Sequence, residues 1–71
     1  MIVHGRIIAV QEQRFRLMSD GGQSYVLTLA GGAPLDTDRL ADFKQSGARV
    51  SVRMEGEPNL TGGIARNIEP A

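Results

Sequence analysis

The chain of 71 residues contains no cysteine. Disulfide bonds, thiolate nucleophiles and zinc–thiolate sites are therefore excluded. A chain of this length buries only roughly 60% of the surface that its unfolded form exposes. Without a disulfide, the apolar core has to supply the stability unless a partner or a second copy contributes. We expect a single domain spanning residues 1–71.

Groups that carry catalysis or hold metals are scarce as well. His4 is the only histidine, and no second ligand stands at a metal-binding spacing from it. Closely spaced acids occur at Glu55 and Glu57 and at Asp36 and Asp38, but acids in a loop or at a helix start ordinarily serve solubility and the helix dipole. The phosphate-loop pattern GxxxxGK[ST] is absent. We therefore expect no enzyme activity and no cofactor or metal.

Long apolar runs are also missing. The N-terminal stretch MIVHGRIIAV is interrupted by His4, Gly5 and Arg6. It is too short and too polar for a signal peptide or a membrane span. We expect a cytoplasmic protein that does not bind membranes.

The chain has no excess of either charge, because eight lysines and arginines balance eight acids. The two signs are nevertheless segregated, with the acids mainly in expected turns, a helix and the C-terminal tail. Such segregation steers charged ligands even at zero net charge. The alternative is that these arginines are only the solvated half of alternating strands. The arginines in strand-like segments are Arg6, Arg14, Arg16, Arg49, Arg53 and Arg66.

Two strand-like runs joined by a tight turn form the expected centre of the fold. The runs are Arg14–Ser19 and Ser24–Ala30, and both alternate with the period of two that is typical of strands. Between them, the sequence Asp20-Gly21-Gly22 tolerates positive φ and predicts a hairpin. The alternation turns Phe15 and Leu17 inward, and it places Tyr25, Leu27 and Leu29 on one face of the second run.

Three further strands are expected. Ile2–Val10 is rich in β-branched residues, and Gly5 within it predicts a bulge or corner where one strand serves both sides of a closing sheet. Ala48–Met54 alternates again, and Ile64–Ile68 is a short fifth strand. Residues 69–71 are expected to be a frayed tail. The inward residues of the fourth strand are Val50, Val52 and Met54.

A short helix is expected between the third and fourth strands. Asp36 is suited to cap its first amides, with Leu35 packing on Leu40 as a hydrophobic staple. Leu40 and Phe43 form one narrow apolar stripe, and Gly47 stands at the usual C-terminal position. Because so short a helix is unstable alone, we expect it to bury this stripe at one end of a barrel.

The order strand, strand, strand, helix, strand, strand resembles that of the OB-fold, a five-stranded Greek-key barrel. The resemblance covers nearly the whole chain and includes Gly5 in the first strand and Gly47 at the helix-to-strand junction. At the level of fold it extends to short bacterial proteins such as translation initiation factor 1 and the cold-shock group. It implies an all-β domain with one short helix. An SH3-like barrel is the alternative, although it usually lacks a full helix at this point.

The resemblance implies a ligand face around the second and third strands. These strands supply Arg14, Arg16, Tyr25 and Thr28, and the fourth strand supplies Arg53. Arginine forks would bind phosphates, and one base would stack on Tyr25. The alternative is that Tyr25 belongs to the core with Leu27 and Leu29. The loop at 55–63 would flank this face with Glu57, Asn59 and Thr61.

Two functions are compatible with this pattern. The first is a non-enzymatic module that binds single-stranded RNA or DNA through Arg14, Arg16, Tyr25 and Arg53. The second is an interaction or assembly module that binds another protein or a second copy of the chain. Arginines clustered on one concave face would favour nucleic acid, whereas an exposed apolar patch or strand pairing between copies would favour protein.

Overall fold

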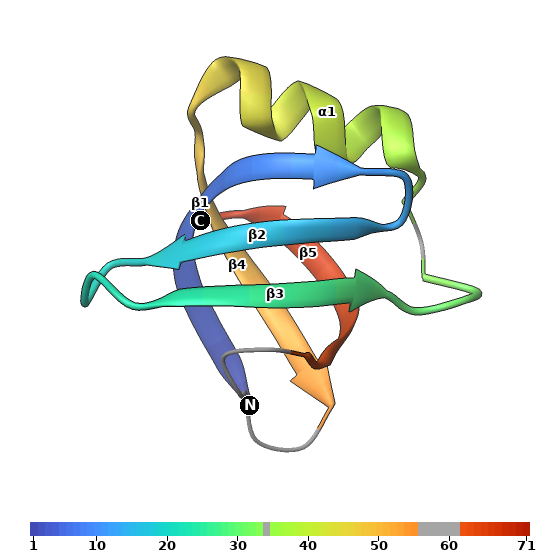
Figure 1. Ribbon diagram of the computed structural model, residues 1–71, viewed down its shortest axis with the longest axis horizontal. Coiled ribbons are helices and arrows are strands. Elements are labelled where there is room, and N and C mark those ends of the chain that lie inside the picture. Colours follow the sequence, from blue (N-terminus) through green and yellow to red (C-terminus); the bar gives the residue numbers. More distant parts are fainter. Residues whose placement is uncertain (34, 56–61) are drawn as a thin grey trace.

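The computed structural model describes residues 1–33, 35–55 and 62–71. The strands form a closed barrel in the order β1-β2-β3-β5-β4, with β4 pairing back to β1 (Figure 1). This barrel and the order β-β-β-α-β-β confirm the predicted fold class, and the arrangement is compatible with an OB-like fold. The elements are β1 (Ile2–Gln11), β2 (Arg14–Ser19), β3 (Ser24–Leu29), α1 (Thr37–Ser46), β4 (Arg49–Glu55) and β5 (Ile64–Pro70).

β1 joins both halves of the barrel, and Gly5 lies where the two halves meet. Gly5 pairs with Ser19 of β2 on one side and with Val50 of β4 on the other. A Cβ built at Gly5 would clash with the carbonyl of Met18 and would lie 2.8 Å from the Cα of Ser19. Only glycine therefore permits this close approach of two backbones. The predicted corner, at which one strand serves both sides of the closing sheet, is confirmed by the pairing of Gly5 with β2 and with β4.

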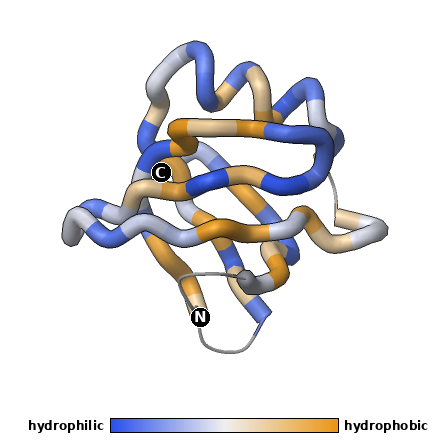
Figure 2. The backbone as a smooth tube through the Cα atoms, viewed as in Figure 1, coloured by the Kyte–Doolittle hydropathy of each residue, from blue (hydrophilic) through white to orange (hydrophobic). Residues whose placement is uncertain are grey.

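The core is made by the inward residues of all five strands together with Leu40 and Phe43 of the helix, and in β2, β3 and β4 the inward residues are those that alternation predicts. The chain colouring in Figure 2 shows this alternation of hydrophobic and hydrophilic residues along the strands. Leu17, Leu27, Val50 and Val52 are completely buried, and Phe15 is 2% exposed. No polar or charged residue of the described chain is buried. The core is thus held by apolar burial alone.

Two bulges interrupt the alternation. On β1, the pairing with β2 shifts between Ile7 and Ala9 and leaves Ile8 as an extra residue. Ile7 and Val10 consequently both pack on the core, although they are three residues apart. On β5, a second shift in the pairing with β4 leaves Arg66 as an extra residue with no partner residue on β4. Ala65 and Ile68 are consequently both buried, although they are three residues apart. Each bulge reverses the inward and outward positions of the rest of its strand.

The helix α1 begins and ends as predicted. Asp36 Oδ1 accepts a hydrogen bond of 3.1 Å from the Arg39 amide, and Gly47 ends the helix with φ of 68°. Leu40 and Phe43 are buried, and the helix packs against β1 at one end of the barrel (Figure 1). The predicted plug is therefore present.

The C-terminal strand is longer than predicted. Residues 69–71 were expected to be frayed, but Glu69 and Pro70 pair with β4 and the Ala71 amide donates to the Arg49 carbonyl at 3.0 Å. The ladder between β5 and β4 continues on both sides of the second bulge, from Ile64 to Pro70. β5 also closes the barrel through a short parallel ladder with β3, which pairs Thr28 with Ile64.

We predict that Gly5→Ala destabilises the protein by more than about 3 kcal/mol, because the added methyl meets backbone that cannot move without opening the barrel. A domain of this size has a total stability of roughly 4–11 kcal/mol. Urea denaturation followed by circular dichroism would measure the change. Gly31→Ala is the matched control, since a Cβ there meets no atom within 4 Å. It should change stability by less than about 0.5 kcal/mol. Equal effects of the two substitutions would contradict this account of Gly5.

Candidate nucleic-acid interface

Arg14 and Arg16 lie on the outer face of β2, in the middle of the three-stranded surface formed by β1, β2 and β3. Both are exposed, whereas Phe15 between them is buried. We call this surface the arginine face. It consists of two rows of paired residues, Ala9, Arg16 and Val26 in one row and Gln11, Arg14 and Thr28 in the other.

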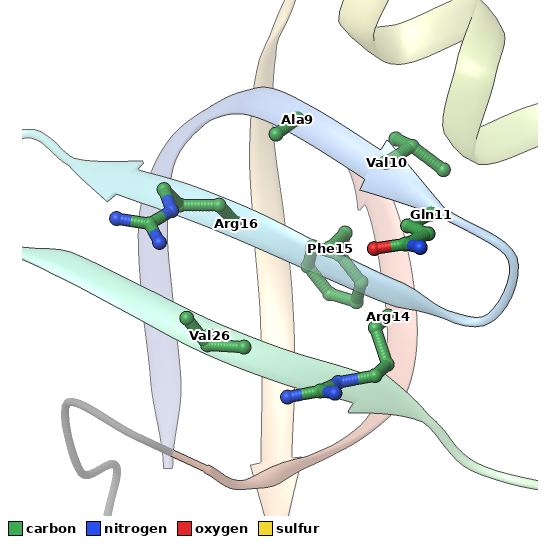
Figure 3. Close-up of a pocket in the computed structure, with 7 residues that line it drawn as sticks. All are labelled: Ala9, Val10, Gln11, Arg14, Phe15, Arg16 and Val26. Atoms are coloured by element: carbon green, nitrogen blue, oxygen red, sulfur yellow. The ribbon is translucent and has the colours of Figure 1, made fainter.

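A shallow hollow of about 460 Å³ lies on the arginine face. Its lining comes from all three strands and includes both arginines, and none of the described residues that line it is acidic. Figure 3 shows Arg14 and Arg16 extending from β2, with Val26 on the neighbouring β3. The hollow is open to solvent, so it suits an extended ligand lying across the strands better than an enclosed small molecule.

Within the part of the chain that the structure describes, the two arginines of this face have no hydrogen-bond or ion-pair partner, whereas the side chains of three other arginines do. Neither Arg14 nor Arg16 forms a hydrogen bond or an ion pair with a residue that the structure describes. Glu12, which lies in the turn before β2, pairs with neither of them. Their guanidinium groups therefore keep all of their donors for a ligand.

Other arginines are occupied by contacts within the fold. Arg49 Nε donates to Asp20 Oδ2 at 2.9 Å, and Arg66 Nη2 donates to Glu55 Oε1 at 2.7 Å. Arg6 Nε donates to the Gly47 carbonyl at 3.1 Å. Asp20 and Glu55 are thus paired with Arg49 and Arg66, and they do not neutralise Arg14 and Arg16. The arginine face can therefore be positive although the net charge of the chain is zero.

Tyr25 does not join the arginine face. It pairs with Leu17, which is completely buried, and it packs against the core cluster from the opposite side of β3 to Val26. Its hydroxyl lies 3.4 Å from Gln23 Oε1, as a long hydrogen bond. Tyr25 and the two arginines therefore lie on opposite faces of the sheet, and Tyr25 has the core position that its alternation with Leu27 and Leu29 left open.

Arg53 is exposed on β4, away from the other predicted site residues. It pairs with Ile2 of β1 and Asn67 of β5. It lines a separate and smaller hollow with Ile2, Ser51, Asn67 and Glu69. The four predicted residues therefore do not form one site, although Arg14 and Arg16 do lie together.

Sequence reasoning missed Ala9 and Val26 as members of this surface. The position of Val26 could have been predicted, because alternation along β3 turns it to the face opposite the inward Leu27. Ala9 could not, because the bulge at Ile8 reverses the end of β1 and turns Ala9 outward. Ile8 is itself 44% exposed. The predicted loop contacts Glu57, Asn59 and Thr61 lie outside the described residues.

Two other types of site are absent from the described residues. It contains no cluster of three or more His, Cys, Asp or Glu residues that could hold a metal ion. Over the same residues, no helix has the length and apolar character to cross a membrane. Comparison of the chain with protein-family models, curated proteins and solved structures gives no significant match.

We predict that the pKa of Asp20 lies below its ordinary value of 3.8, chiefly because the Arg49 guanidinium hydrogen-bonds to the carboxylate. The pKa of Asp20 is thus lower in the folded than in the unfolded chain. The ion pair with Arg49 therefore stabilises the fold fully above pH 3.8, and this stabilisation is lost as the pH falls through the folded-state pKa. Titration of the side-chain carboxyl carbon by NMR would measure it. Arg49→Gln should move the pKa back toward 3.8, and Arg53→Gln should leave it unchanged. An unchanged pKa in Arg49→Gln would contradict the assignment.

Proposed function

We propose that the protein is a small, non-enzymatic cytoplasmic module of OB-like fold that binds single-stranded nucleic acid through the arginine face. The observation that carries the proposal is the position of Arg14 and Arg16 on one surface, with no carboxylate partner among the described residues. A guanidinium in this state binds phosphate oxygens through paired, charge-assisted hydrogen bonds. Burying such a charge against an uncharged partner would be unfavourable, so a polyanion is the better ligand.

The geometry of the arginine face suits an extended single strand of nucleic acid. Arg14 and Arg16 are two residues apart along β2, so their Cα atoms are separated by roughly 6.6 Å. β1 and β3 extend the surface on both sides, with the small residue Ala9 and the aliphatic Val26 flanking Arg16. A single strand could lie across this surface without meeting a bulky side chain, and the hollow in Figure 3 gives it room.

A protein-interaction module is the second candidate. Ile8 and Ile64 are exposed by 44% and 42%, and Ile64 pairs with Thr28 at the border of the arginine face. A protein partner would bury these two side chains, although single exposed aliphatic residues are also common on protein surfaces. Under this alternative the two arginines would bind acidic side chains of the partner, and nucleic acid would not bind.

We predict that labelled single-stranded RNA and DNA bind at low salt with a dissociation constant of roughly 1–100 µM. Two phosphate contacts give a slope of about −1.4 for log K against log salt. Arg14→Gln and Arg16→Gln should each reduce the magnitude of this slope by about 0.7, because each removes one contact. Fluorescence anisotropy over a range of salt concentrations would provide both quantities.

Arg53→Gln is the control, since it removes an exposed arginine from a different wall of the barrel that also lacks a side-chain partner among the described residues. It should leave affinity and slope nearly unchanged. If no oligomer binds even at low salt, nucleic-acid binding is disproved and the protein-interaction alternative gains support. If Arg53→Gln weakens binding as much as Arg16→Gln does, the arginine face is not the site.

A further inference from the structure

We infer that the arginine face recognises the phosphates of a single strand and not its bases, so that binding is independent of base sequence. This inference rests on the proposed function and specifies its ligand as a linear phosphodiester. It follows from which side chains the fold leaves on the arginine face and which ones it uses in the core.

Stacking platforms are missing from the arginine face because the core uses the aromatic residues. The chain has only three, Phe15, Phe43 and Tyr25. Phe15 and Phe43 are 2% and 5% exposed, and Tyr25 packs on the core side of β3. Proteins that bind single strands by stacking place such rings against successive bases. Phe15 is among the residues that line the hollow, but at 2% exposure its ring offers almost no surface on which a base could stack.

The remaining side chains of the face offer little that distinguishes one base from another. Ala9 and Val26 provide only aliphatic contacts, which any sugar or base can satisfy. Gln11 and Thr28 are uncharged and polar, but they flank Arg14 in its own row and are therefore placed to reach the phosphate that Arg14 binds. The two guanidinium groups are the strongest donors on the surface, and phosphate is the strongest acceptor on the strand.

The test compares oligomers that have the same number of phosphates and differ only in their bases. Fluorescein-labelled oligomers of about 15 nucleotides would be titrated at low salt, a length that covers one OB-like domain. The probes are oligo(dT), oligo(dA) and an oligomer of abasic phosphodiester spacers. We expect their dissociation constants to agree within about threefold, and we expect all three to weaken in the Arg14→Gln, Arg16→Gln double variant.

Loss of even one stacked base would weaken the abasic oligomer between about fivefold and a hundredfold. A result in that range, or a comparable preference for oligo(dT) or oligo(dA), would overturn the inference while leaving the proposed function intact. If none of the three oligomers binds, both the inference and the proposed function fail. The two failures are therefore distinguishable.

The variant Tyr25→Leu tests whether the ring of Tyr25 stacks on a base, as the sequence predicted, or does not contribute to binding, as we infer. It should leave the affinity for oligo(dT) unchanged within about twofold, with folding checked by circular dichroism. Because Tyr25 is half-buried, this substitution could also disturb the core. Tyr25→Phe keeps the ring and therefore serves as the comparison. A fivefold or greater loss in a folded Tyr25→Leu protein, with Tyr25→Phe unaffected, would show that the ring contacts a base and would overturn the inference.

Discussion

The close approach of β1 to β2 at Gly5 is the constraint on which the barrel depends. At this residue β1 pairs with β2 and β4 together, so a single strand connects the two halves of the sheet. The space that a Cβ would occupy is filled by the backbone of Met18 and Ser19. Any larger residue would separate β1 from β2, and the inward residues of β2 and β4 would no longer meet in one core.

The bulge at Ile8 has a second consequence beyond curvature, because it determines the composition of the arginine face. Without the bulge, the pairing of Ile7 with Leu17 would continue so that Ala9 points inward, Ile8 lies beside Arg16 and Val10 lies beside Arg14. The extra residue reverses this, so that Val10 packs on the core and the small Ala9 lies beside Arg16. Arg16 therefore has an open surface on its β1 side. The device that bends the strand also clears room for a ligand.

Local patterns in the sequence were sufficient to predict the elements, the helix caps, the special role of Gly5 and the inward residues of β2, β3 and β4. They were not sufficient to predict the site. Arg16 and Arg53 both point outward, but outward directions diverge on a closed barrel. β4 is separated from β2 by β1 on one side and by β3 and β5 on the other. Strand order depends on long-range pairing, which alternation along the chain does not encode. The bulges escaped prediction for the same reason, since they appear only as shifts between paired strands.

The small size of the chain links its stability to the kind of ligand it can bind. A domain of 71 residues without cysteine or tryptophan needs its few large apolar side chains in the core. Phe15 and Phe43 are used there, so stability and base stacking compete for the same residues. Charged groups are not subject to this competition, because they remain on the surface in any case. Electrostatic recognition through unpaired arginines is therefore the mode of nucleic-acid binding that a barrel of this composition can support without weakening its core.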